Sequence, residues 1–328
     1  MKLSELLVFE KRLETIIMGT THGARYSEYR DSMLELISDS EFAPDYLVAS
    51  ISDCFNKINQ LYFDIGEPIS NLHGYILSKI KQLQADLHAQ SQKEYVEEIT
   101  RFQLDKQSAS TNYVEYIKQF QMAISDDDAN IIESRLKGLT DWKYPGMMFR
   151  PFLGKKYLLN LVASDPLYLL DHSRNLLTES INSFPKLYQR RLRLYEIDDS
   201  LDDFMATLPD NQFGFVLAYY FFNFKPQSVV LLYLQQVWKK LRPGGIFALS
   251  LNDCDFAENA SLAELKYAHF NSGAMLIGAA EEIGYEVYYQ YHTTSELHWF
   301  ELRKPGELSS LRGGQSLAQV YTRQKELF

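Results

Sequence analysis

Residues 235–253, QQVWKKLRPGGIFALSLND, carry the signal that decides the fold class. A helical segment ends with three cations, which suit the negative end of a helix dipole. The Pro-Gly-Gly at 243–245 then breaks the helix, and the almost wholly apolar run 246–251 follows, as in a strand buried on both faces. Helix, tight turn and buried strand are half of a crossover unit. The sequence therefore predicts a mostly parallel α/β sheet, with Asn252 and Asp253 at its ligand-binding edge.

The composition allows two domains with real cores. The chain has 328 residues, 46% of them hydrophobic and 14% aromatic, which excludes global disorder. The net charge of -10 argues against a broad nucleic-acid surface, and no apolar run is long enough for a membrane span. Cys54 and Cys254 have no metal or disulfide spacing. We expect a soluble, cytoplasmic protein that binds neither membrane nor nucleic acid.

Residues 1–140 are predicted to form an all-helical domain, because apolar residues recur there every three or four positions. The longest segment, 70–104, has two interpretations. It is a coiled-coil arm for a homo-oligomer or an assembly partner, or it packs against a helix at 111–124 within one chain.

Three aspartates, Asp126, Asp127 and Asp128, begin the last helix of this domain. A metal site is one interpretation. A solvated helix start is favoured, because no histidine or further ligand set lies nearby and acids suit the positive end of the dipole. No metal site is therefore assigned.

From residue 144 the pattern changes to alternating strands and helices. The first strand is followed by Arg150 and the fourth by Tyr219 and Tyr220. The second ends at Asp171, His172 and Ser173. Asp171 lies 20 positions after Pro151, the offset at which an acid can bind ribose hydroxyls. The predicted strands are 146–149, 166–170, 193–197, 213–218, 246–251, 285–291 and 297–302, the last two as an antiparallel hairpin.

Laid out in this order, residues 141–304 resemble the class I S-adenosylmethionine (SAM) dependent methyltransferases, with residues 305–328 as a tail. The resemblance rests on the LRPGGIFALS turn and strand, on the strand order, and on the acids after strands two and three. It implies a seven-stranded Rossmann-like sheet with SAM as cofactor. By the resemblance, Asp171 binds the ribose, with His172 and Ser173 beside it. Asp198 faces the adenine, with Ile197 and Asp199 as further candidates.

The same resemblance assigns residues 150–154 to the methionine end of SAM and residues 219–221 to the reaction pocket, with Asn252 at its far rim. The family's first turn usually reads E/D-x-G-x-G. Here it contains Arg150, Phe152 and a single glycine, Gly154. Arg150 either pairs with the SAM carboxylate or fills the pocket and blocks it.

The acceptor is not identified by any motif. The motifs of amino-methylating and cytosine-methylating DNA enzymes are missing, which favours a protein or a small molecule over a DNA base. Tyr219, Tyr220 and His172 are the catalytic candidates. The two tyrosines are alternatively core residues, and His172, like the other histidines near strand ends (His269, His292 and His298), is alternatively structural.

Two functions follow from this pattern. The first is a SAM-dependent methyltransferase, favoured by Asp171 and Asp198. The second is a catalytically inactive methyltransferase-like scaffold, favoured by the glycine-poor turn at Arg150. Residues 250–315 most resemble methyltransferase-like proteins of tailed phages, which would place the chain in the host cytoplasm or the virion.

Overall fold

The computed structural model describes residues 1–21, 26–39, 41–58, 65–104, 125–151, 161, 163–182, 184–198, 203–293 and 297–307. The chain forms two compact units, each discontinuous in sequence. Unit 1 combines Met1–Gln90 with Cys254–Tyr267, and unit 2 combines Ser91–Asp253 with Ala268–Phe328. The expected domain limits at 140 and 304 stay predictions.

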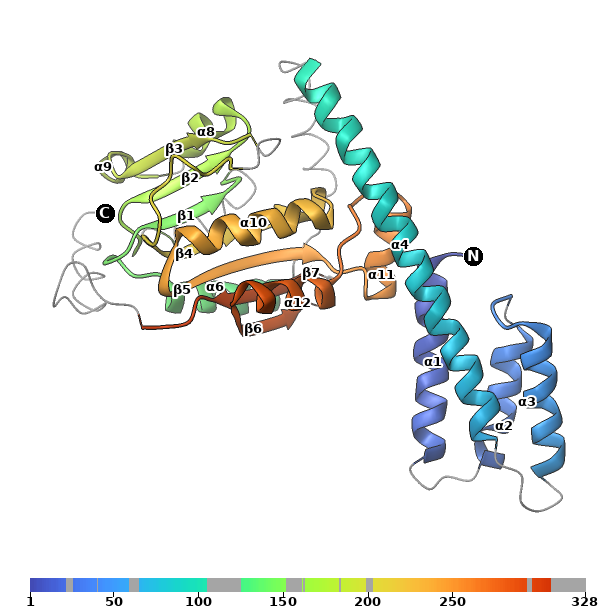
Figure 1. Cartoon of the computed structure of the whole chain (residues 1–328). Coiled ribbons are helices and arrows are strands. Elements are labelled where there is room, and N and C mark those ends of the chain that lie inside the picture. Colours follow the sequence, from blue (N-terminus) through green and yellow to red (C-terminus); the bar gives the residue numbers. More distant parts are fainter. Residues whose placement is uncertain are drawn as a thin grey trace. The chain divides into compact units, whose positions relative to one another are not determined.

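Unit 1 is helical, as its sequence pattern indicates. In α1, the residues buried at helical spacing include Leu6, Phe9 and Leu13. Its amino end meets Glu264, whose carboxylate accepts hydrogen bonds from the backbone N–H groups of Leu3 and Ser4. These N–H groups have no partner within the helix itself. The unit contains α1 (Leu3–Thr21), α2 (Tyr26–Ser38), α3 (Asp45–Ile58), the first part of α4 (Gly66–Leu104) and α11 (Ala257–Glu264) (Figure 1).

The long helix predicted after residue 68 is confirmed as α4, one helix of 39 residues. It contributes to both units, and Tyr95 lies in the first core cluster of unit 2. The expected partner helix at 111–124 lies outside the described residues. The choice between a coiled-coil arm and packing within one chain therefore stays open.

Unit 2 is built on a seven-stranded sheet of order β3-β2-β1-β4-β5-β7-β6. All neighbours from β3 to β5 are parallel, and β7 is antiparallel to both β5 and β6. This confirms the predicted mostly parallel, Rossmann-like sheet with a terminal hairpin. The strands are β1 (Gly146–Phe149), β2 (Leu167–Asp171), β3 (Leu192–Glu196), β4 (Phe213–Ala218), β5 (Leu241–Asn252), β6 (Glu286–His292) and β7 (Leu297–Arg303) (Figure 1).

The prediction of a turn at 243–245 before the strand is wrong in detail, because β5 already begins at Leu241. Gly244 has φ 77°, and its N–H donates to the carbonyl of Lys304, so the chain stays paired through the irregular stretch. The β4–β5 register shifts between Phe213 and Phe215. The Pro-Gly-Gly sequence therefore forms a bulge within the strand and not a turn before it.

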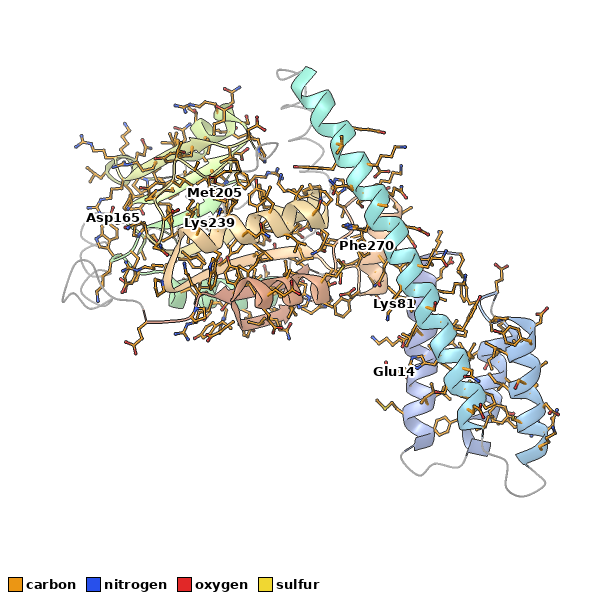
Figure 2. The ribbon with its side chains drawn as sticks, viewed as in Figure 1. Glu14, Lys81, Asp165, Met205, Lys239 and Phe270 are labelled. Carbon is orange, nitrogen blue, oxygen red and sulfur yellow. The ribbon has the colours of Figure 1, made fainter. Side chains whose placement is uncertain are left out.

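Two apolar clusters cover the two faces of the sheet. The first contains α10 (Gln227–Lys240), α12 (Gly273–Ile283) and one buried side of the strands, with Met205 beside them (Figure 2). The second contains residues of α6 (Asp126–Leu139), α8 (Arg174–Ile181), α9 (Lys186–Gln189) and the other side of the strands. The sheet is thus the middle of three layers. Among the described helices, none combines the length and the apolar composition that crossing a membrane requires.

The three aspartates open α6, as predicted, and Ser125 caps it by accepting from the N–H of Asp128. Asp128 differs from a solvated residue, because it is 1% exposed and accepts a hydrogen bond from the Tyr291 hydroxyl. This bond raises the pKa of Tyr291 to about 12. The carboxylate therefore ties α6 to β6.

Candidate functional site

The candidate site lies at the carboxyl edge of the sheet, where β1 and β4 are neighbours. The chain runs from β1 to β2 and β3 on one side of this point and from β4 to β5 on the other. In open parallel sheets, such a switch in direction leaves a crevice outside the strand ends. Arg150, Asp171, Asp198 and Tyr219 follow or end these strands and therefore lie along this one edge, and their roles in binding a cofactor stay predictions.

Asp171 ends β2 and is only 2% exposed. Its Oδ1 accepts the N–H of Ser173 at 3.1 Å, whereas the buried Oδ2 has no hydrogen-bond partner among the described residues. Burial raises the pKa of the Asp171 carboxyl, and the nearby positive charges of Arg150 and Lys225 oppose this only in part. The site thus holds an acceptor oxygen without a donor from the described chain.

His172 has both ring nitrogens engaged. Nδ1 lies 2.9 Å from the carbonyl oxygen of Ile197, and Nε2 lies 3.2 Å from Nζ of Lys225. A lysine ammonium only donates and a carbonyl only accepts, so Nδ1 carries the proton and Nε2 accepts from Lys225. In this arrangement His172 is neutral and holds the end of β2 to β3. To accept a proton on Nε2, His172 would have to lose its hydrogen bond from Lys225.

Arg150 follows β1 directly and is 2% exposed, in a left-handed backbone conformation with φ 47°. Its N–H donates to the carbonyl of Leu170 at 2.7 Å, and its guanidinium lies 5.0 Å from the centre of the Phe221 ring. A non-glycine residue in this conformation is strained, and such strain gathers at functional sites. Phe152 and Gly154, the other expected contacts of this turn, lie outside the described residues.

The segment after β4 divides its side chains between the two faces. The rings of Tyr219 and Tyr220 pack edge to face in the second cluster, 4.9 Å apart. Tyr220 has φ 51°, and its N–H donates to Ser250 Oγ at 2.9 Å. Phe221 lies in the first cluster and stacks on Phe149 and on His172. Phe221 is therefore the aromatic residue of this segment that packs on His172, the residue next to Asp171.

Two further predicted residues lie at the ends of β2 and β3. Ser173 caps α8 by accepting from the N–H of Leu176 with its side chain, while its own N–H binds Asp171. Asp198 is exposed just after β3, next to the buried Ile197. Asp199 lies outside the described residues. The polar residues that follow β2 and β3 thus lie at the same edge of the sheet.

Lys225 and Tyr95 belong to this site and were missed in the sequence. Lys225 is 2% exposed, and its ammonium donates to the Tyr95 hydroxyl at 3.1 Å as well as to His172. The rings of Phe221, Tyr233 and Tyr95 surround it at 4.9, 5.5 and 5.4 Å. A lysine within the aromatic run YYFFNFK was the available signal. Its partner, 130 residues away on α4, was not visible.

The other candidate bases occupy different positions. The N–H of His269 donates to the carbonyl of Asn223, and its ring packs edge to face on Tyr95. His298 lies at the start of β7 and pairs with Asp253, with His292 beside it. His298 is the histidine that an acid orients at the sheet edge.

No family model and no curated protein sequence matches the chain, whereas many solved structures are similar to it. One is a SAM-dependent methyltransferase from Aquifex aeolicus, 14% identical, with a TM-score of 0.39 over 55% of this chain and 90% of that one. Another, from Mesorhizobium loti, is 12% identical, with a TM-score of 0.38 over 49% and 90%. The [4+2]-cyclase SpnF is 11% identical, with a TM-score of 0.44 over 56% and 84%. At such low identities the likeness concerns the fold and does not say which ligand the chain binds.

Proposed function

We propose that the chain binds SAM at the carboxyl ends of β1, β2 and β4 and transfers its methyl group to an acceptor. The observation that carries this proposal is the Asp171 carboxylate, buried at the end of β2 with one oxygen lacking a donor among the described residues. A buried acceptor of this kind costs roughly 1–3 kcal/mol when left unsatisfied. A ribose hydroxyl would satisfy it.

The residues around Asp171 fit the rest of the cofactor. Ser173 already holds Oδ1, which leaves Oδ2 for the ligand. Asp198, exposed after β3, suits the adenine side, and the Arg150 guanidinium suits the methionine carboxylate. SAM supplies an electrophilic methyl group, so the protein's main contribution is to position the acceptor. We infer a protein or a small molecule as acceptor.

A specific observation also favours a second function, that of an inactive scaffold. Arg150 and Asp171 are each 2% exposed and Phe221 is fully buried, so these groups are covered in the described conformation. As a scaffold, the chain would use its helices for homo-oligomer or assembly contacts. A phage origin, with a place in the host cytoplasm or the virion, belongs to this second proposal.

Calorimetric titration with SAM and S-adenosylhomocysteine separates the two proposals. Binding of either compound at roughly micromolar concentration would support the enzyme and would show that the covering residues move aside. Adenosine, which lacks the amino-acid part of the cofactor, is the control that shows how much this part contributes to binding. A folded protein that binds neither SAM nor S-adenosylhomocysteine at millimolar concentration would overturn the cofactor site and leave the scaffold.

A further inference from the structure

A second group of polar side chains lies at the same sheet edge, outside the cofactor site. Asp253 directly follows β5, and His298 is the second residue of β7, which pairs with β5. Oδ2 of Asp253 lies 2.7 Å from Nδ1 of His298, and Oδ1 accepts the N–H of Gly273 at 2.8 Å. Asp253 is 2% exposed and the His298 side chain 11%. The acid is thus held at both oxygens and the imidazole is partly accessible.

The start of α12 fixes the carboxylate. Gly273 is the first residue of this helix, and a helix amino end favours a negative charge. The approach is so close that a Cβ on Gly273 would lie 2.2 Å from Oδ2 of Asp253. On its other side, the His298 ring packs against Phe300 at 3.9 Å between ring centres. The local structure therefore holds the pair in one geometry.

This geometry selects one tautomer of His298. The carboxylate oxygen only accepts, so Nδ1 of His298 carries the hydrogen and donates it. Nε2 is then the nitrogen with the lone pair, and it is the one that can take up a proton. A histidine that an acid orients in this way is arranged to act as a general base.

The position of the pair suits a methyl acceptor. Asp171 on β2 would hold the nucleoside, so an acceptor would approach from the side of β4, β5 and β7. The two sites are joined by residues 269–273. Within this segment, Nδ2 of Asn271 donates to the carbonyl of Lys225 at 3.0 Å, and Gly273 binds Asp253. His298 and the residues proposed to bind the cofactor thus lie along one connected edge of the sheet.

We infer that His298 is the general base of the methyl transfer and that Asp253 is its positioning residue, an inference that rests on the proposed function. The acceptor is a hydroxyl or an amine that must lose a proton. Its oxygen or nitrogen bonds to the methyl carbon, and the carbon–sulfur bond breaks with its electron pair on sulfur. The proton of the acceptor passes to Nε2 of His298, which leaves the methylated acceptor and S-adenosylhomocysteine.

Diethyl pyrocarbonate, which modifies an unprotonated imidazole nitrogen, tests this without a known acceptor. We expect S-adenosylhomocysteine to slow the modification of His298, measured by peptide mass spectrometry, by about tenfold. His73, which pairs with Glu10 in unit 1, is the internal control and should keep its rate. Calorimetric binding without protection of His298 would overturn the general base but not the cofactor site. No binding at all would overturn the proposed function, and the base with it.

Asp253→Asn tests the positioning role. The amide oxygen would stay on the Gly273 N–H, which turns the NH₂ group toward His298 and forces Nδ1 to accept. The nitrogen-15 spectrum should then show the proton of His298 moved from Nδ1 to Nε2, with the rate of modification reduced at least about tenfold. An unchanged tautomer and rate in the folded variant would contradict the positioning role.

Discussion

At the scale of single residues, Asp171 is the feature that sequence and structure both single out. Its spacing from the first turn predicts a ribose-binding acid, and the structure places it at the end of β2. The sequence could not show that the carboxyl is buried, nor that Arg150 and Lys225 lie near enough to act on its pKa. These depend on contacts between distant segments, which local patterns do not encode.

The burial of Asp171 predicts a pH-dependent stability. The folded state raises the pKa of this acid, so its contribution to stability is greatest at low pH and is lost as the pH rises through the raised value. Asp171→Asn cannot ionise. We expect it to be more stable than the wild type at pH 8 by about 1 kcal/mol, a common size for one substitution. Urea unfolding at pH 8, 6 and 5 checks this.

The advantage of Asp171→Asn should shrink toward pH 5. Glu196→Gln is the matched control, because it removes an exposed carboxylate at the paired position of β3. We expect no comparable change from it. A less stable Asp171→Asn protein with no dependence on pH would show that the carboxylate is satisfied in the unliganded state.

At the scale of elements, the positions of the strands follow from apolar runs, and their order follows from the resemblance. The bulge in β5 does not. Residues 243–245 have the composition of a turn, and only the pairing with β4 and with Lys304 makes the stretch part of the strand. In the same way, the pattern YYFFNF does not reveal that Tyr219 and Tyr220 pack on one face and Phe221 on the other. The face is set by the backbone at Tyr220.

Replacing glycine by alanine should have opposite effects on the free energy of unfolding at positions 245 and 278. A Cβ on Gly245 would lie 2.8 Å from the carbonyl oxygen of Phe213 and 2.9 Å from that of Arg242, so Gly245→Ala must push β4 and β5 apart. We expect a loss of about 1–3 kcal/mol in the free energy of unfolding. Gly278 in α12 has nothing within 4 Å of its added Cβ, and Gly278→Ala should gain about 0.5–1 kcal/mol. Equal effects in denaturant titration would refute this account of the bulge.

At the scale of the whole molecule, each compact unit contains segments from distant parts of the chain. Residues 254–267 follow β5 but belong to unit 1, where Glu264 of α11 binds the amino end of α1. Local patterns gave no sign of this. The helix α11 has only eight residues, and its role depends on an acceptor meeting N–H groups about 260 positions earlier.

This connection predicts an effect at one end of α1. Glu264→Ala removes the acceptor for Leu3 and Ser4, and we expect a loss of about 1 kcal/mol, the usual effect of losing a helix cap. Hydrogen exchange should quicken at these two amides and stay unchanged in β5. Glu258→Ala, at an exposed position of the same helix, is the control. Unchanged exchange in Glu264→Ala would show that α11 does not secure α1.

The most direct test of the cofactor site is calorimetric titration of S-adenosylhomocysteine into three proteins: wild type, Asp171→Asn and Glu196→Gln. We predict binding by the wild type and by Glu196→Gln, and at least about a hundredfold weaker binding by Asp171→Asn, because the amide oxygen would stay on the Ser173 N–H and an NH₂ group would replace the Oδ2 that accepts from the ribose. Equal affinity in a folded Asp171→Asn protein would contradict the assignment of Asp171 as the ribose-binding residue.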